Sequence, residues 1–349
     1  MAPTTQKAAV IQRDGSVALH EIAVPKPGPN EILVKVVAAT QNPADWKTAL
    51  MARRAGSVAG CDFSGIVEEI GSNVPPGLRS TGERVAGLVL GGIFPNGAFA
   101  EYLVTLADFV VHVPDTWSFE DAAQLGIAPL TALRMLHEML ELPEPRLPVP
   151  ARHRAPPGPP DTTVLVSGGA SSVGQYVVQF AKLSGLYVIA TASERNFDLV
   201  RSFGADVVVD YRDPAGVIEH VADCVAEGTS FEIVAGALSG KGTIAYLTLA
   251  DYPTAEGVKV LRSIVFDCFG MDYDFPLPFT ASPELTALGR KWIQLLSELL
   301  VKADVRPNPA LIQPYGLASV ADGFHYMSEG KVSAQKITYR ISDTPAEIL

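Results

Sequence analysis

The first 125 residues show short apolar or alternating runs separated by Gly, Pro and Asn. Runs of this length bounded by turn residues are typical of β-strands. The predicted strands are KAAVI, EILVKVVAA, SGIVEEIG, ERVAGLVLGG, AFAEYLV and FVVHVP. This part of the chain is therefore predicted to form an all-β unit.

The pattern changes at Phe119, where apolar residues recur at helical spacing through residue 140. Ser118 is a plausible N-cap for this segment, which predicts one helix or a pair of helices between two domains. Residues 143–160 then hold eight of the chain's 27 prolines. Proline lacks the N–H donor, so neither a helix nor a ladder strand is expected there. We interpret this insertion as an extended surface loop, either inert or a recognition segment for a partner.

The central part of the chain contains nearly continuous apolar strands alternating with helical segments. Strands that are apolar on both faces and joined through helices predict a parallel sheet covered on both sides. The predicted strands are TVLVSGGA, LYVIATAS, ADVVVDY, FEIVAGA and TIAYLTL, and the helical segments are SVGQYVVQFAKLSG, NFDLVRSFG and PAGVIEHVADCVAEG.

One connection in this pattern is too short. Only about a turn's worth of residues separates FEIVAGALSG from KGTIAYLTL, whereas a parallel pair needs a crossover of roughly 10–12 residues or more. Either the sheet is rearranged or the strand assignment is wrong. A rearranged sheet would be compatible with a protein whose original activity has been lost or changed.

The C-terminal region begins with the amphipathic segment ELTALGRKWIQLLSELLVKADV and ends in strand-like sequence, KITYRI being the last. We expect this tail to fold back onto the first domain. The predicted fold class is α/β, with a β domain at 1–125 that is completed by 305–349. A doubly wound parallel-sheet domain is predicted at 126–304, with the insertion 143–160 inside it.

Composition narrows the functional classes. The 349 residues carry 27 Lys+Arg against 38 Asp+Glu, a net charge of −11, and 48% are hydrophobic. This chain can bury a core, and its acidity argues against nucleic acids and anionic membranes as partners.

The N-terminus lacks a basic region followed by an apolar stretch, and no stretch reaches the ~18 apolar residues of a membrane span, so we expect a soluble, cytoplasmic protein. Cys61, Cys224 and Cys268 are too few and too scattered for a disulfide framework.

The strongest chemical signal is a glycine-rich turn between a predicted strand and a predicted helix. In G-x-G-x-x-G register, Gly169 and Gly174 supply the first and third glycines, while Ser171 stands at the second. Such a turn aims backbone N–H groups and a helix N-terminus at a pyrophosphate. We predict dinucleotide binding by Gly169, Ser171, Ser172, Val173 and Gly174.

The end of the next strand indicates which dinucleotide is bound. An Asp or Glu there would hold the ribose of NAD, whereas a 2′-phosphate needs donors and positive charge. The run here includes Ser193, Glu194, Arg195 and Asn196. Ser193 and Arg195 can donate to a phosphate, so we predict NADPH, although Glu194 turned inward would favour NAD. Tyr211 is a further candidate contact near the adenosine phosphate.

Taken together, these motifs resemble the medium-chain dehydrogenase/reductase superfamily over essentially the whole chain. More narrowly they resemble its zinc-independent fungal branch of trans-acting enoyl reductases of polyketide synthases and toxin-cluster reductases. The resemblance is carried by Asn42-Pro43-Ala44-Asp45-Trp46-Lys47, Gly60-Cys61-Asp62-Phe63-Ser64-Gly65, the proline-rich insertion, residues 190–199, Asp210-Tyr211-Arg212 and residues 329–333. The resemblance implies a GroES-like β domain beside a Rossmann domain.

The resemblance also implies an activity: NADPH delivers a hydride to the β-carbon of an α,β-unsaturated thioester, and the α-carbon is then protonated. Zinc-dependent relatives need a Cys, a Gly-His-Glu set and a four-Cys lobe, but this chain offers Gly60-Cys61-Asp62 and no such lobe. We therefore expect no metal site. The partner implied is a polyketide synthase with an acyl-carrier-bound substrate, and the narrower family suggests a monomer.

The residue roles implied by the resemblance are as follows. Lys47 matches the active-site lysine, whose ammonium could orient the cofactor or substrate, or stabilise the enolate that hydride addition creates. Lys47 also matches a cofactor contact. Ala44, Asp45, Trp46, Leu247, Thr248, Val332 and Ser333 match cofactor contacts. Asn42, Leu130, Thr131, Arg134, Gly270, Met271, Asp272, Tyr273 and Asp274 match the segments that line the substrate pocket. No residue is identified as the proton donor.

Two alternatives stay open. The first is an NADPH-dependent quinone or enone reductase that acts on free small molecules. The second is a non-redox isomerase or cyclase on the same scaffold, which the shortened connection and Ser171 favour.

Overall fold

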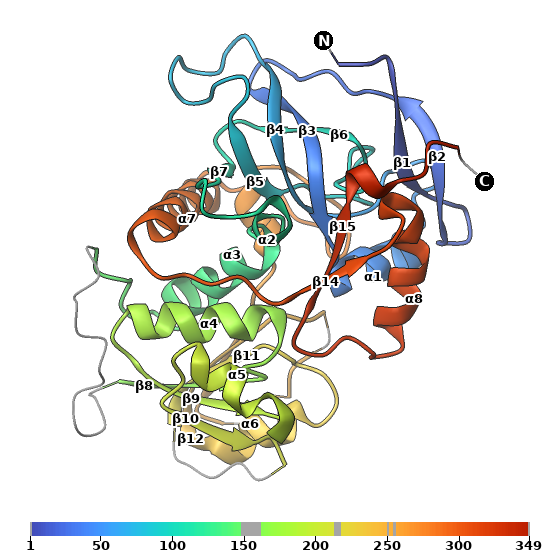
Figure 1. Cartoon of the computed structure of the whole chain (residues 1–349). Coiled ribbons are helices and arrows are strands. Elements are labelled where there is room, and N and C mark those ends of the chain that lie inside the picture. The colour runs from blue at the N-terminus through green and yellow to red at the C-terminus, as the bar shows by residue number, and fades with distance from the viewer. Residues whose placement is uncertain (1, 148–161, 213–217, 250, 254–255, 348–349) are drawn as a thin grey trace. The chain divides into compact units, whose positions relative to one another are not determined.

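The computed structural model describes residues 2–147, 162–212, 218–249, 251–253 and 256–347. The chain forms two compact units, each built from separate stretches of sequence (Figure 1). The first comprises Met1–Ile127, Phe266–Ser297 and Pro307–Leu349, and the second Ala128–Val265 and Glu298–Arg306. In the part of the chain that is described, no helix is both long and apolar enough to cross a bilayer.

The first unit is built on β-strands, as the alternating pattern predicted. A hairpin pairs β1 with β2, and a seven-stranded sheet has the order β14-β15-β3-β4-β5-β7, with β6 also paired to β3. Strand β15 near the C-terminus pairs antiparallel with β3, placing Thr338 opposite Thr40. The strands are β1 (Thr5–Ile11), β2 (Val17–Ala23), β3 (Glu31–Thr40), β4 (Asp62–Ile70), β5 (Arg84–Leu88), β6 (Tyr102–Leu106), β7 (Val110–His112), β14 (Ala310–Gln313) and β15 (Lys336–Arg340).

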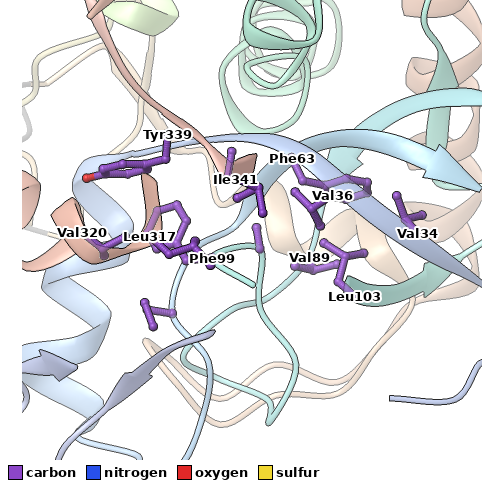
Figure 2. Packing of buried hydrophobic residues seen from close by; sticks show 14 of the residues in the cluster. Val34, Val36, Phe63, Val89, Phe99, Leu103, Leu317, Val320, Tyr339 and Ile341 are labelled. Atoms are coloured by element: carbon purple, nitrogen blue, oxygen red, sulfur yellow. The ribbon is translucent and has the colours of Figure 1, made fainter. Parts of the chain in front are cut away.

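The core of the first unit is a cluster of aliphatic side chains that also includes aromatic rings (Figure 2). The ring of Phe99 meets that of Tyr339 edge to face at 5.3 Å and lies 6.2 Å from that of Phe324. Tyr339 belongs to β15 and Phe324 to helix α8 (Val320–Ser328). The C-terminal segments thus supply part of the core of a unit that begins at the N-terminus.

The first 125 residues also contain a helix, which the prediction of an all-β unit did not include. Helix α1 (Pro43–Ala52) has a proline in its first turn, and α2 (Phe119–Ala122) is capped by Ser118, whose Oγ accepts from the N–H of Asp121 at 3.0 Å. The predicted helical segment after residue 122 becomes α3 (Ile127–Leu133) followed by a π-helical stretch, Arg134–Met139. The long amphipathic segment forms α7 (Pro283–Lys302).

The second unit is a six-stranded parallel sheet in the order β10-β9-β8-β11-β12-β13. This is the doubly wound order of a Rossmann fold, so the predicted fold class is confirmed. Helix α4 runs along β8 and β9 (Figure 1). The elements are β8 (Thr163–Ser167), α4 (Ser172–Leu183), β9 (Tyr187–Ala192), α5 (Phe197–Ser202), β10 (Val207–Asp210), β11 (Ile218–Asp223), α6 (Ser230–Ala237), β12 (Leu238–Tyr246) and β13 (Val258–Arg262).

The sequence assignment was wrong at the fourth strand. The predicted helix PAGVIEHVADCVAEG contains strand β11, and the predicted strand FEIVAGA forms most of helix α6. Val221 of β11 and Val234 of α6 are both fully buried in the same cluster. Short apolar runs do not distinguish strand from helix by periodicity. The crossover between β11 and β12 therefore spans residues 224–237 and includes α6, which meets the length a parallel pair needs.

The segment 266–297 groups with the first unit, although the sequence placed it in the second domain. The rings of Phe269 and Phe109 lie 4.8 Å apart, and Arg290 Nε is 2.6 Å from Asp108 Oδ2. These contacts attach the segment to the β-rich unit. Residues 148–160 of the predicted proline-rich insertion lie outside the described residues.

Candidate active site

The glycine-rich turn of the second unit lies between β8 and α4, as predicted. Gly168 has φ +76°, and the N–H groups of Gly168 and Gly169 donate to Thr191 Oγ1 at 3.0 Å and Thr191 O at 2.8 Å. A Cβ on Gly174 would lie 2.2 Å from the carbonyl oxygen of Gly168. Only glycine allows α4 to start so close to the turn.

Ser171 explains the departure from the three-glycine pattern. Its Oγ accepts the N–H of Gly174 at 3.1 Å, so the serine is the N-cap of α4. The cap orders the first turn of a 12-residue helix. The N-terminus of such a helix favours a phosphate group, so the turn fits the pyrophosphate of a dinucleotide.

The predicted ribose-side residues gather where β9 and β10 end. Ser193 is the N-cap of a 3-10 turn, Glu194–Asn196, and Asn196 Nδ2 donates to Ser193 Oγ at 3.2 Å. The N–H of Tyr211 donates to Ala192 O at 3.3 Å, which places the end of β10 beside the start of this turn. Arg195, Ser193 and Tyr211 therefore share one corner of the sheet's C-terminal edge.

Sequence reasoning missed a second cation at this corner. Arg212 pairs with Asp210 at 2.8 and 2.5 Å and lies 5.6 Å from the ring centroid of Tyr211. Hydrogen bonding to this guanidinium lowers the pKa of Asp210 to about 2, and the same contact raises the pKa of Arg212. The signal was present, because Asp210-Tyr211-Arg212 is one of the motifs that carry the resemblance.

The predicted residues after β12 lie beside the end of β11. Leu247 and Thr248 directly follow β12, and Thr248 Oγ1 donates to the carbonyl of Ala226 at 3.0 Å. The ends of β11 and β12 belong to the second half of the doubly wound sheet, whose C-terminal edge receives the second nucleotide of a dinucleotide.

The first predicted substrate segment is buried inside the second unit. Leu130, Thr131 and Arg134 each expose less than a twentieth of their surface. Arg134 Nε is 2.8 Å from Glu138 Oε2, and its Nη1 donates to the carbonyl of Ile264. The guanidinium thus joins the π-helical stretch to the chain after β13, and a bound substrate anion would compete with these partners.

The first unit holds a buried polar cluster at the start of α1. Asp62 is fully buried and accepts from Asn42 Nδ2 and from the N–H of Ile127, both at 2.8 Å. Lys336, itself 2% exposed, lies with its Nζ 3.5 Å from Asp62 Oδ2 and also donates to Asn42 Oδ1. Asp45 Oδ2 accepts the N–H of Asn42 at 2.6 Å. Sequence reasoning missed Lys336, which is distant in sequence from Asn42.

Burial dominates the electrostatics of this cluster. Burial raises the pKa of Asp45 to about 7, assisted by the nearby charge of Asp62. Burial also raises the pKa of Asp62, opposed by Lys336. The pKa of the Cys61 thiol is raised as well, by burial and then by the charges of Asp45 and Asp62. The cluster therefore keeps the thiol protonated and lets Asp45 retain its proton up to about pH 7, beside the Asp62–Lys336 pair.

The donors of this cluster do not fit a tetrahedral zinc ion, which needs four close N, S or O ligands. Within the described residues, no three His, Cys, Asp or Glu side chains are grouped so as to hold a metal ion. Asp62 is occupied by an amide, a backbone N–H and the ammonium of Lys336. The positive charge facing Asp62 is supplied by the chain itself.

Lys47 and Trp46 follow Asp45 on α1. Lys47 Nζ lies 5.6 Å from the ring centroid of Trp46. Both Trp46 and Val332 pack against the core cluster of the first unit. The predicted residues of α1 and of the 332–333 segment therefore belong to one unit, and Ala44 lies in the first turn of α1.

The second predicted substrate segment, residues 270–274, is fixed next to the end of α1. Asp274 forms an ion pair with Arg54, just past α1. Asp272 Oδ1 accepts the N–H of Ala281 at 2.8 Å, and the Tyr273 hydroxyl donates to Asp267. Gly270 has φ +68° and Met271 follows it. The ion pair thus places Asp274 beside the chain that follows the C-terminal end of α1.

Comparisons with known proteins agree with this architecture. Residues 28–115 match the alcohol dehydrogenase GroES-like domain, and residues 172–268 match the zinc-binding dehydrogenase family. Among solved structures, the CurK enoyl reductase superposes with a TM-score of 0.75 at 18% identity, covering 96% of this chain and 99% of that one. The quinone oxidoreductase of Coxiella burnetii gives 0.69 at 24% identity, covering 96% and 99%. At these identities the similarity shows the fold.

Full-length sequence relatives are more specific. The chain is 35% identical over 353 residues to the trans-enoyl reductase ACTTS2 of Alternaria alternata, covering 97% of this chain and 99% of the relative. It is 32% identical over 363 residues to the trans-enoyl reductase caaB of Aspergillus niger, covering 97% and 98%. The chain therefore belongs to the family of the fungal trans-enoyl reductases, within the medium-chain dehydrogenase/reductase superfamily.

Proposed function

We propose that this protein is an NADPH-dependent, zinc-independent enoyl reductase that acts in trans on an α,β-unsaturated polyketide thioester carried by a polyketide synthase. The observation that carries the proposal is the full-length similarity to trans-enoyl reductases. A monomeric, cytoplasmic enzyme of fungal secondary metabolism is part of the same proposal.

The preference for NADPH rests on the corner where β9 and β10 end. Ser193 supplies a hydroxyl, and Arg195 and Arg212 supply two guanidinium groups. A 2′-phosphate would form charge-assisted hydrogen bonds with these donors. The charge of Glu194 contributes to raising the pKa of Arg212, so this arginine offsets part of the negative charge of Glu194 at the corner.

The cofactor, when bound, supplies the hydride that adds to the β-carbon of the substrate. This addition moves the π-electron pair towards the thioester oxygen and leaves an enolate. The ammonium of Lys47 would stabilise that negative charge, and the α-carbon then takes a proton from solvent. One hydride and one proton are consumed for each C=C bond that is reduced.

The proposal is tested by titrating the purified protein with NADPH and NADH and then adding a short enoyl thioester. We expect selective binding of NADPH and loss of its absorbance on addition of the thioester. Oxidation of NADPH by a free enone or quinone with no preference for a thioester would favour the alternative reductase. Binding of NADPH without turnover of any enoyl thioester would contradict the proposed reaction.

Arg195→Ala separates the two cofactors. A charge-assisted hydrogen bond contributes about 1.5–3 kcal/mol, so the Kd for NADPH should rise roughly 10- to 150-fold while that for NADH stays unchanged. The matched control is Arg201→Ala on α5, where the arginine is half exposed and pairs with Asp198 at 3.1 Å. Equal losses for both cofactors would contradict the 2′-phosphate assignment.

The non-redox alternative has lost its main support. It was favoured by an apparently missing crossover, but residues 224–237 with α6 provide that crossover. Ser171, its other support, is accounted for as the N-cap of α4.

A further inference from the structure

A fully buried carboxylate lies at the C-terminal end of β11. Asp223 is 0% exposed, and among the described residues it is paired with no Lys, Arg or His. Its Oδ1 accepts the N–H groups of Val225 at 3.1 Å and Ala226 at 3.0 Å, and its Oδ2 accepts the hydroxyl of Tyr252 at 3.0 Å. Three donors thus take the place of a cation.

The partners of Asp223 join two turns. The backbone donors belong to the turn after β11, and Tyr252 belongs to the segment after β12. Thr248, which also follows β12, makes a second link to the turn after β11, because its Oγ1 donates to Ala226 O at 3.0 Å. We name this arrangement the Asp223 clamp, made of Asp223, Val225, Ala226, Thr248 and Tyr252.

Two neighbouring aromatic rings pack against the ring of Tyr252 and hold its hydroxyl in position. Its ring lies 4.6 Å from that of Phe231, edge to face, and 4.8 Å from that of Tyr246. The side chain is 7% exposed. Burial, followed by the charge of Asp223, raises the pKa of Tyr252, so the phenol remains protonated and donates.

The clamp adjoins the glycine-rich turn. The N–H of Cys224 donates to Ser167 O at 3.0 Å, at the end of β8. A Cβ on Gly168 would lie 2.4 Å from the side chain of Val225. The turn held by Asp223 therefore borders the turn that fits the pyrophosphate.

The strand order of the sheet indicates which half of a dinucleotide would lie at the Asp223 clamp. The order in which the chain adds strands to the parallel sheet reverses between β8 and β11. Strands β9 and β10 lie outward from β8 on one side, and β12 and β13 lie outward from β11 on the other. A dinucleotide lies across this switch point, with one mononucleotide on each half. The predicted 2′-phosphate residues occupy the β9–β10 half, which leaves the nicotinamide mononucleotide for the β11–β12 half.

We propose that Asp223 and Tyr252 are positioning residues that hold the turn at Val225–Ala226 and Thr248 against the nicotinamide half of the cofactor. This inference rests on the nicotinamide cofactor of the proposed function. It does not depend on the identity of the substrate to be reduced.

The test compares Tyr252→Phe with Tyr246→Phe. The first removes only the hydroxyl that donates to Asp223. The second removes a hydroxyl on the neighbouring ring, where it accepts from Arg262 Nε at 2.8 Å, and it leaves the hydrogen bond from Tyr252 to Asp223 in place. Two probes are titrated: NADPH, and adenosine 2′,5′-bisphosphate, which lacks the nicotinamide half.

For Tyr252→Phe, the Kd for NADPH should rise about 5- to 10-fold, the loss expected for one hydrogen bond, while the Kd for adenosine 2′,5′-bisphosphate stays within twofold. Tyr246→Phe should change neither Kd. Asp223→Asn should behave like Tyr252→Phe, because an amide nitrogen cannot accept the phenol. The melting temperature is recorded for each variant, and a loss of stability alone would affect both probes equally.

Equal weakening of both probes by Tyr252→Phe, or no change in either, would overturn the proposal. A wild-type protein that binds neither probe would overturn it together with the proposed function. If the wild-type protein binds NADPH but reduces no enoyl thioester, the proposed function fails, and the ratio of the two Kd values still decides the role of the clamp.

Discussion

Replacing Asp45 by asparagine should change how the stability of the first unit depends on pH. The carboxylate is 2% exposed, and burial raises its pKa from 3.8 to about 7. A carboxyl group whose pKa is higher in the folded state binds a proton more tightly when folded. Its contribution to the free energy of unfolding is therefore fully present below about pH 4 and is lost as pH rises through about 7.

The magnitude follows from the two pKa values. A difference of one pKa unit corresponds to about 1.4 kcal/mol, so the complete transition between pH 4 and pH 8 amounts to roughly 4 kcal/mol. Between pH 5 and pH 8 the same relation gives about 2–3 kcal/mol. The asparagine side chain would not titrate, and its amide oxygen can still accept the N–H of residue 42. Relative to wild type, Asp45→Asn should therefore gain about 2–3 kcal/mol between pH 5 and pH 8.

The assay is urea unfolding followed by tryptophan fluorescence at pH 5, 6, 7 and 8. All three tryptophans, Trp46, Trp117 and Trp292, belong to the first unit, so the signal reports on the unit that contains Asp45. The control is Asp115→Asn, which changes an exposed carboxylate. A constant offset between Asp45→Asn and wild type over this pH range would refute the reasoning.

Three further predictions concern the turn, the core and α1. Gly174→Ala should weaken NADPH binding more than tenfold, because a Cβ would lie 2.2 Å from Gly168 O; an unchanged Kd in a fluorescence titration would contradict this. Phe99→Ala should lower the free energy of unfolding by about 3–5 kcal/mol, because the ring is fully buried against Tyr339; a loss below about 1 kcal/mol by urea unfolding would mean that the core collapses around the gap. Lys47→Ala should mainly lower kcat in steady-state assays, and a change confined to KM would make the lysine a binding residue.

Local patterns were sufficient to predict the two domain types and the glycine-rich turn between a strand and a helix. The strand-turn-helix around Gly169 and Gly174 is encoded within a short stretch, and the structure has it where the sequence placed it. The fourth strand was misread because Val221 and Val234 both lie in short apolar runs of similar composition. Which run becomes the strand depends on packing against the rest of the sheet, and the pattern does not contain that information.

The buried cluster of the first unit could be predicted only in part. Asn42, Asp45 and Asp62 were singled out through their motifs, but Lys336 was not. Lys336 donates a hydrogen bond to Asn42, which is 294 positions away in sequence. No local sequence pattern in the tail predicts that this lysine is buried. Arg212 lies within one of the motifs, but the motif does not reveal that its guanidinium pairs with Asp210 at the end of β10.

The pairing of β15 with β3 also bears on how the chain folds during synthesis. Residues that meet there, such as Gln41 and Tyr339, are separated by 298 positions, so the ribosome has made almost the entire protein before they can meet. The second unit is nearly contiguous and has all its strands before α7 emerges, so it can fold first. Until the tail arrives, Asp62 has no Lys336 beside it and the core has no Tyr339. A nascent chain stalled before residue 336 should therefore carry an unpaired stretch of β3 that is prone to pair with other chains, together with a Rossmann sheet that is already formed.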